Sequence, residues 1–287
     1  MYHVGKILVA DLDPISVSFI RWFIATIFLM VMYYRGNGRS NFLPPAKNVP
    51  ILMVLGLLGV FIYNLLFFFA EKLISGNVLS IIYSFSPAIA VILSTIFFKT
   101  KTNLLTWIGI IVSVIGAIAI INLSNPNCNS FFCSDIIGGI SFGKFLAIGL
   151  SICMAIYSLV SRKAKTLGIS SLAITTYGAL WGTFFLLICA IFEGNLYQIF
   201  SLNTTFWLAM LYASIGANVL GYKWFNDSVS ELGIIKTVIF QNGIPLTAII
   251  VGYLFFEEKI STSICLSSVI IIIGILLTNY SLIKNPD

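Results

Sequence analysis

The chain has 287 residues, of which 59% are hydrophobic and only 9% are charged, and its formal net charge is +6. Because roughly a quarter of the residues in soluble domains are charged, this composition excludes a soluble protein and predicts that lipid is the main solvent. The basic residues gather in short loops between apolar runs, which is typical of membrane proteins and excludes a nucleic-acid partner.

Candidate membrane spans follow one another along the chain, since a helix needs about 20 residues to cross a bilayer. The opening stretch, "MYHVGKILVA", is too short to span and leads directly into "DLDP". The nine complete spans that we predict after it are 15–34, 50–71, 76–98, 104–123, 142–161, 170–192, 206–225, 232–255 and 262–283. Short loops make neighbouring helices antiparallel, and the longest connection, the polar segment 124–141, divides the chain near its middle.

The loops also predict which side of the membrane each segment faces. If the loop 35–49 is cytosolic, alternation places ten basic residues on that side: Arg35, Arg39, Lys47, Lys99, Lys101, Arg162, Lys163, Lys165, Lys223 and Lys284. The opposite side receives three, Lys72, Lys144 and Lys259. This bias predicts a multi-pass protein of the cell (inner) membrane with a cytosolic C-terminus.

Two similar phrases indicate an internal repeat. "YSFSPAIAVILSTIFFKTK" begins at Tyr83 and "QNGIPLTAIIVGYLFFEEK" begins at Gln241, so that Pro87 and Pro245 are 158 residues apart. The two phrases would cross the membrane in opposite directions, as in the inverted repeats of many secondary transporters. We therefore predict a first repeat at 1–123, a connecting loop at 124–141 and a second repeat at 142–284. The first helix is expected to be truncated, because the partner of the helix at 142 would begin before residue 1.

Several segments together resemble the drug/metabolite transporter superfamily, in particular its EamA-type members. They are "DPISVSFIRWFIAT", "GLLGVFIYNLLFFFAEKLISGN", "YSFSPAIAVILSTIFF" and "YKWFNDSVSELGIIKTVIFQNGIPLTAIIVGYLFFEEKIS". The resemblance implies an all-α integral membrane protein with ten helices in two inverted five-helix repeats, cytosolic termini and a central substrate cavity. The sequence departs from the family in its short first helix and at Thr100, where the family often has the glutamate that Glu258 keeps in the second repeat.

Prolines within two predicted spans mark the candidate binding site. A proline inside a helix leaves the carbonyl four residues earlier without its donor, which here concerns Tyr83 and Gln241. In lipid such a carbonyl needs a protein or water partner, and a broken helix near the membrane midplane is a pointer to a substrate site. The alternative is a pair of kinked helices whose polar groups satisfy each other.

Polar and aromatic residues inside the spans complete the predicted site. The candidates for substrate contact are Tyr63, Asn64, Tyr83, Ser84, Ser86, Tyr157, Trp181, Asn218, Tyr222, Gln241 and Asn242, with Pro87 and Pro245 as hinges. Buried amides can instead join helices, and aromatic residues can instead lie at the membrane interface. Two charged residues within spans, Arg21 and Lys236, are expected to extend toward the nearest membrane surface.

Enzyme chemistry finds little support in the sequence. "GISFG" at 139–143 matches a serine-nucleophile pattern, but that pattern requires a preceding strand and a histidine partner, and His3 is the only histidine. No catalytic residue, metal site or cofactor is predicted. Cys128 and Cys133 lie in the polar loop, and the sequence leaves open whether they pair.

The sequence thus predicts a secondary transporter that works by alternating access. Its substrate would be a small polar or amphipathic metabolite, with an amino acid as first candidate and export as the direction. Its partners would be this substrate and the lipid bilayer, and a homodimer stays open. The alternatives are a translocator of lipids or lipid-linked substrates, and a membrane scaffold without transport.

Overall fold

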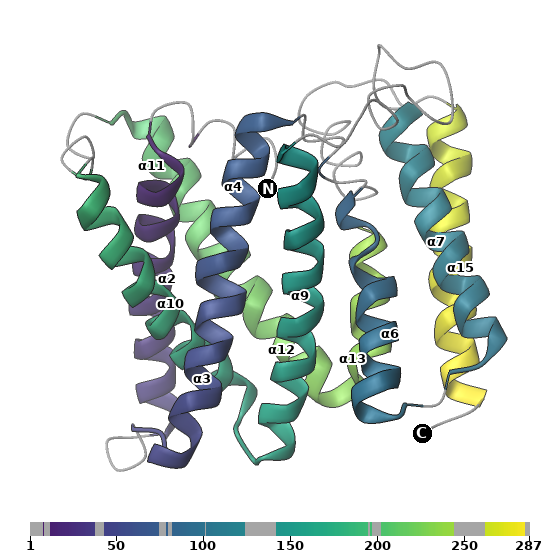
Figure 1. Cartoon of the computed structure of the whole chain (residues 1–287), viewed down its shortest axis with the longest axis horizontal. Coiled ribbons are helices and arrows are strands. Elements are labelled where there is room, and N and C mark those ends of the chain that lie inside the picture. Colours follow the sequence, from purple (N-terminus) through teal and green to yellow (C-terminus); the bar gives the residue numbers. More distant parts are fainter. Residues whose placement is uncertain are drawn as a thin grey trace. The chain divides into compact units, whose positions relative to one another are not determined.

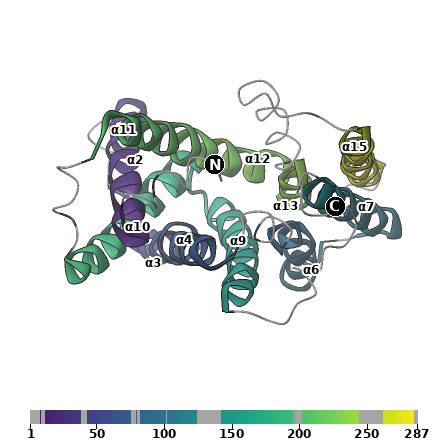
Figure 2. The same ribbon diagram turned by 90° about the horizontal axis from the view of Figure 1, so that it is seen from above.

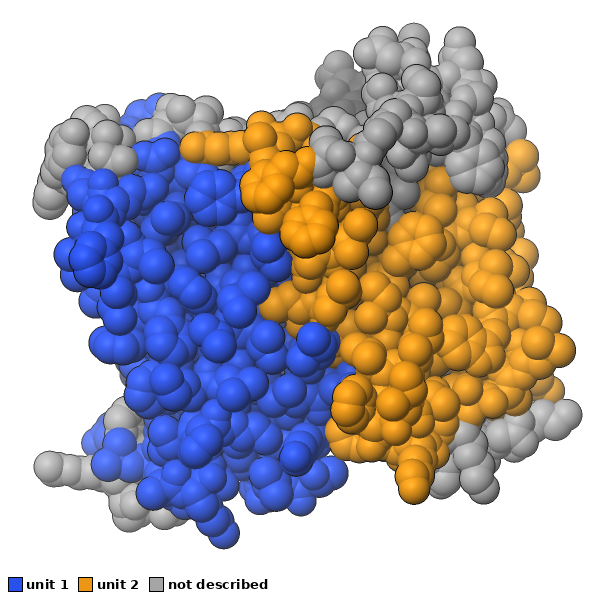
Figure 3. Space-filling view, in the orientation of Figure 1, with its two compact units in different colours: residues 1–71, 156–231 blue, residues 72–155, 232–287 orange. Residues whose placement is uncertain are grey.

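The computed structural model describes residues 8, 12–37, 43–74, 79, 82–100, 102–123, 142–194, 196, 202–243 and 262–284, and every regular element in these ranges is a helix. The chain divides into two compact units, coloured separately in Figure 3. Unit 1 comprises Met1–Glu71 and Ile156–Glu231, and unit 2 comprises Lys72–Ala155 and Leu232–Asp287. Each unit therefore combines a segment of one predicted repeat with a segment of the other.

Unit 1 contains helices from both predicted repeats. Its elements are α2 (Pro14–Asn37), η1 (Ala46–Asn48), α3 (Val49–Gly56), η2 (Leu57–Ile62), α4 (Tyr63–Leu73), the second part of α9 (Phe142–Thr166), α10 (Ser171–Glu193), α11 (Thr204–Leu211), η4 (Tyr212–Gly221) and α12 (Tyr222–Leu232). η1 is a 3-10 turn, whereas η2 and η4 are π-helical.

Local sequence signals set the ends of these helices. The side chain of Ser170 accepts a hydrogen bond from the Ala173 amide at 3.2 Å and so caps the start of α10. Asn203 caps α11 in the same way, because its side-chain oxygen accepts a hydrogen bond from the Phe206 amide at 2.8 Å. α10 ends at Glu193, and the next residue, Gly194, has a φ of 74° in the left-handed region that glycine adopts without strain.

Helices from the two halves of the chain pack against each other within unit 1. α2 packs against α10 and η4, while α10 packs against α3 and η2 (Figures 1 and 2). Glycine permits one of these close approaches, because a Cβ on Gly56 would lie 2.6 Å from the carbonyl oxygen of Gly178. The buried core between these elements consists of Trp22, Ala25, Leu29, Val60, Ala179, Leu186 and Val219.

The π-helical segments occupy corresponding places in the two repeats. Adding 158 to residues 57–62 gives residues 215–220, which lie within η4 (Tyr212–Gly221). A π-helical turn holds one more residue than an α-helical turn and is found frequently at functional sites. The interval that relates the two proline-containing phrases thus also relates two irregular helical turns.

Unit 2 is built around a close helix pair. Its elements are α6 (Ser86–Phe98), α7 (Leu104–Leu123), the first part of α9, α13 (Ile234–Val238), the 3-10 segment η5 (Ile239–Gly243) and α15 (Thr262–Lys284). α7 and α15 lie side by side (Figures 1 and 2), with Gly109 against Thr278 and Gly274 against Ser113. Their core consists of Val91, Ile110, Val114, Ala117, Ile118, Ile235, Ile239, Ile271 and Ile275.

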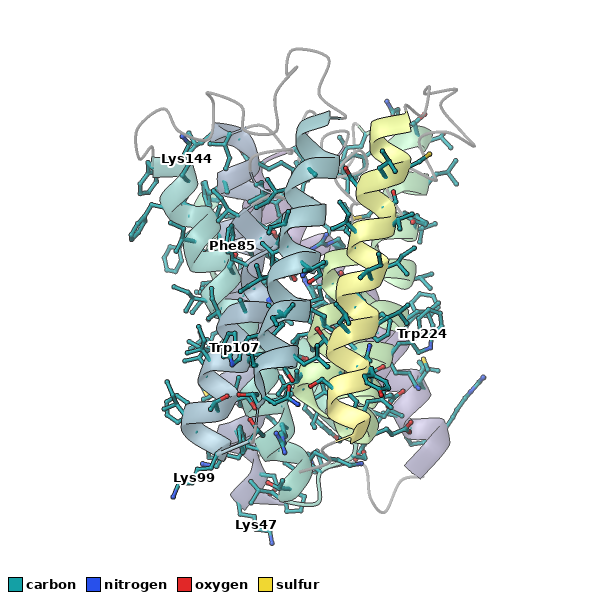
Figure 4. All side chains as sticks on the ribbon, turned by 90° about the vertical axis from the view of Figure 1, so that its right-hand side faces the viewer. Lys47, Phe85, Lys99, Trp107, Lys144 and Trp224 are labelled. Carbon is teal, nitrogen blue, oxygen red and sulfur yellow. The ribbon has the colours of Figure 1, made fainter. Side chains whose placement is uncertain are left out.

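The described helices have the length and surface of membrane spans. Four are long and apolar enough to cross a bilayer: Pro14–Gly36, Ala46–Leu73, Phe142–Thr166 and Ser171–Glu193. Large apolar side chains also point outward along α15, where Leu266, Val269 and Ile273 are exposed at helical spacing. Within unit 2, the charged ends of Lys99 and Lys144 lie at opposite ends of the bundle (Figure 4). The all-helical membrane fold is confirmed, while the count of spans and the inversion of the halves stay predictions.

Two predicted spans are not single helices in the structure. Residues 82–83 are helical, Ser84 and Phe85 form a turn, and α6 begins at Ser86. Pro87 is therefore the second residue of a helix rather than the middle of one, a place where its missing N–H is not needed. In the second half, α13 ends at Val238 and continues into η5, and Pro245 lies outside the described residues, as do Cys128 and Cys133.

Candidate functional site

The predicted contact residues fall into two sets, one in each unit. Unit 1 holds Tyr63, Asn64, Tyr157, Trp181, Asn218 and Tyr222. Unit 2 holds Tyr83, Ser84, Ser86, Gln241 and Asn242, together with Pro87.

A buried arginine lies at the centre of the polar cluster in unit 1. Arg21 on α2 is only 3% exposed, and its Nη2 atom donates a hydrogen bond to Oδ1 of Asn64 on α4. Its Cζ atom lies 5.1 Å from the centre of the Phe68 ring, a cation–π contact. The expectation that Arg21 extends to the membrane surface is wrong, because an amide and an aromatic face meet the guanidinium inside the bundle.

Three buried donor groups, two on this arginine and one on the next residue, have no acceptor. The Nε and Nη1 atoms of Arg21 and the indole Nε1 of Trp22 are buried and have no hydrogen-bond partner. Glu71 is 8% exposed, and its charge attracts that of Arg21. Among the described residues, Arg21 and Glu71 are the only buried side chains that ordinarily carry a charge.

Aromatic side chains connect this cluster to the second repeat. The Tyr222 hydroxyl, at the start of α12, donates to the Gly59 carbonyl in η2 at 2.6 Å. The Tyr222 ring meets Trp22 edge to face at a centroid distance of 4.9 Å, and it meets Tyr157 in the same manner at 5.8 Å. The Tyr157 ring covers Gly59 so closely that a Cβ there would lie 2.5 Å from it. The structure therefore brings Asn64, Tyr157 and Tyr222 together around η2.

Asn226 is a polar centre that the sequence analysis missed. It is 1% exposed, accepts a hydrogen bond from Ser161 at 2.7 Å, and donates to Tyr157 at 2.8 Å and to Thr175 at 2.9 Å. The signal was its spacing, because Asn226 follows Tyr222 by four residues and so lies on the same face of α12.

The remaining candidates of unit 1 are less central. Trp181 is half-buried and lies edge to face with Phe184 on its own helix, with ring centres 6.1 Å apart. Tyr63 is half-buried and stacks on Phe67. Asn218 in η4 is 2% exposed, and its amide nitrogen has no hydrogen-bond partner.

In unit 2, the first helix break is tied to α9 by serine side chains. The Ser151 hydroxyl donates to the Ile82 carbonyl at 3.1 Å, and the Ser86 hydroxyl donates to the Ser151 carbonyl at 3.3 Å. Tyr83 and Ser84 are buried beside these bonds. At this break, the Ile82 carbonyl and the Ser86 hydroxyl are therefore satisfied by protein groups, which is the alternative that the sequence left open.

The second break keeps acceptors that no donor meets. Asn242 is fully buried, and its amide nitrogen donates to the Ser113 hydroxyl on α7 at 2.8 Å. The side-chain oxygens of Gln241 and Asn242 are buried and have no hydrogen-bond partner. Adding 158 to Ser84 and Phe85 gives 242 and 243, so the two breaks correspond along the repeat.

The chemistry available at these sites is recognition of a polar molecule. Unit 1 offers guanidinium, indole and phenol groups around η2, and unit 2 offers two amide oxygens at η5. Among the described residues, no group of three or more His, Cys, Asp or Glu side chains is placed to hold a metal ion.

Known proteins are similar to this chain in sequence and in fold. The model of the EamA-like transporter family matches residues 1–122 and 141–280. The uncharacterized transporter YyaM of Bacillus subtilis is 25% identical over 96% of this chain and 87% of its own length, and the uncharacterized transporter YetK of the same organism is 27% identical over 99% and 83%. A protein of known crystal structure aligns with a TM-score of 0.75 at 14% identity, over 99% of this chain and 93% of its own, which shows that the fold is shared.

Proposed function

Because the chain belongs to the EamA-like transporter family and is therefore a membrane transporter rather than an enzyme, we propose that it exports a small polar or amphipathic metabolite. An amino acid is the first candidate. The buried cluster of Arg21, Asn64 and Tyr222 carries this proposal, since ionisable groups inside membrane proteins mark substrate pathways. The neutral amides and aromatic rings beside it suit a substrate with both polar and apolar parts.

The irregular helices support transport by alternating access, in which one site opens first to one side of the membrane and then to the other. η2 directly precedes the helix that carries Asn64, and η4 directly precedes Tyr222. Helices with such interruptions are the elements that form substrate sites in many secondary transporters. We propose that these turns change geometry while the ordinary α-helices move as rods, in the cell (inner) membrane with the C-terminus in the cytosol.

Metabolite profiling tests the proposed substrate class and direction. Cells that express the protein are expected to accumulate one or a few small metabolites in the medium, compared with cells that lack it, and the purified protein in liposomes is expected to give saturable flux of the same compounds. Movement of labelled lipid between leaflets without solute flux would instead identify a lipid translocator. The absence of both activities from folded protein in liposomes would contradict the proposal.

The amide oxygens of η5 give a direct test of the polar groups in unit 2. The double substitution Gln241→Leu and Asn242→Leu removes both oxygens, which we propose accept hydrogen bonds from the substrate. Two hydrogen bonds at about 0.5–1.5 kcal/mol each predict that KM for the transported solute rises about tenfold or more. The neighbouring Phe240→Leu is the matched control, because Phe240 is 55% exposed. Unchanged flux and affinity in the folded double variant would show that these two residues do not bind the substrate.

A further inference from the structure

We propose that Arg21 binds the carboxylate of the substrate, which is a zwitterion such as an α-amino acid; this inference rests on the transport function proposed above. The observation behind it is a guanidinium that is 3% exposed while its Nε and Nη1 atoms have no hydrogen-bond partner. A buried charge is costly unless its donors are satisfied, and a planar guanidinium matches the two oxygens of a carboxylate.

The surroundings of Arg21 hold the group in place without satisfying it. Asn64 accepts one hydrogen bond from Nη2, and the Nδ2 atom of Asn64 in turn donates a hydrogen bond to the Val60 carbonyl. Phe68 lies beneath the guanidinium. The side chain is therefore oriented by an amide and a ring, neither of which neutralises its charge.

A second donor lies on the adjacent residue of the same helix. Trp22 is fully buried, and its indole N–H also lacks an acceptor. An indole nitrogen can only donate, so its ligand must offer an acceptor, as a carboxylate does. The unpartnered donors of Arg21 and of Trp22 therefore each call for a hydrogen-bond acceptor on the ligand.

The charges limit which anion fits. Arg21 is the only buried Lys or Arg among the described residues, and the negative charge of Glu71 acts on it. A doubly charged phosphate would leave this environment with excess negative charge, because one guanidinium neutralises one unit. A zwitterion brings its own positive charge, so its carboxylate can bind Arg21 without changing the total charge of this environment.

Access to the arginine would come through the π-helical turns. Asn64 follows η2, and Tyr222, which packs on Trp22, follows η4. A change in either turn would move the side chain that covers Arg21 or Trp22, so that the donors become open to a substrate.

The test compares solutes that differ only at the carboxyl group. The purified protein in liposomes is assayed for binding and flux of each neutral amino acid, its amide, the corresponding amine and the corresponding acid without the amino group. The variants are Arg21→Gln, which loses the charge, Arg21→Lys, which keeps the charge but loses the fork, and Arg35→Gln as the control. Arg35 is exposed in the last turn of α2. The measured quantity is the preference of each variant for the amino acid over its amide, which a change in expression or stability does not alter.

The wild type and Arg35→Gln are expected to prefer the amino acid over its amide, and Arg21→Gln is expected to lose roughly 10- to 100-fold of that preference, with Arg21→Lys between them. If an amino acid is carried and Arg21→Gln keeps the preference, the role of Arg21 is refuted and the transport proposal stands. If acids without an amino group are carried in an Arg21-dependent manner, carboxylate binding stands, but the zwitterion and amino-acid assignments fail. If no carboxylate is bound or carried, both are refuted.

Discussion

Gly182→Ala is expected to destabilise the protein strongly, whereas Gly178→Ala, one turn earlier on the same helix, is expected to be neutral or stabilising. A Cβ at Gly182 would overlap the Val60 side chain and lie 2.8 Å from the carbonyl oxygen of Gly56, so that α10 would have to move away from α3 and η2. A Cβ at Gly178 would lie 3.7 Å from its nearest neighbour, Leu55, which is ordinary contact.

The expected sizes follow from packing. Overpacking a close contact costs about 1–3 kcal/mol, while alanine in place of a helical glycine gains about 0.5–1 kcal/mol where there is room. Unfolding of the two variants and the wild type by denaturant in the same detergent measures the difference. Equal stability of both alanine variants would show that α10 does not approach α3 as described.

Asn226→Leu is expected to lower the free energy of unfolding by about 2–4 kcal/mol. The substitution removes the partner of Ser161, Tyr157 and Thr175 at once. Thr175 keeps its hydrogen bond to the Ser171 carbonyl, whereas the Ser161 and Tyr157 hydroxyls lose the bond to Asn226 inside the bundle. Hydrogen bonds between membrane helices contribute about 0.6 kcal/mol on average, and buried groups left unsatisfied cost about 1–3 kcal/mol each.

The neighbouring residue provides the control for Asn226. Asp227→Asn breaks an ion pair with Lys223 at 2.6 Å, but both side chains are about one-third exposed, so a change of about 0.2–1 kcal/mol is expected. Adding Tyr157→Phe to Asn226→Leu should restore part of the loss, because the orphaned hydroxyl is then removed. A double variant as unstable as the sum of the single variants would show that the two residues do not interact.

Composition and periodicity predicted most of the fold. The long apolar runs that became α2, α10 and α15 lie within a few residues of the predicted spans, since about 20 apolar residues have few alternatives to a membrane helix. Pro87 was placed in the middle of a span, because the sequence does not show that the preceding residues leave the helix at Ser84. The interleaving of the repeats in the two units was not predicted, since it depends on contacts between residues more than 100 positions apart.

The site was predicted in its residue types more than in its contacts. Asn64 and Tyr222 were named because buried amides and phenols in spans need partners, and both have them. Arg21 was expected near the membrane surface, and only the packing of Phe68 and Asn64 around it shows otherwise. No feature of the sequence alone indicates which of its nitrogen atoms lack an acceptor.

The division of the chain between the units has a consequence for synthesis on the ribosome. Unit 1 needs residues up to Glu231 and unit 2 needs residues up to the C-terminal helix α15, so neither is complete while only the first half has been made. Because the chain is synthesised at about 5–20 residues per second, the early helices are in the bilayer for seconds before the helices that they pack against have been made. During that time Arg21 can already contact Asn64 and Phe68, which belong to the same half of the chain. The buried charge of Arg21 therefore has polar and aromatic contacts before the rest of unit 1 has been made.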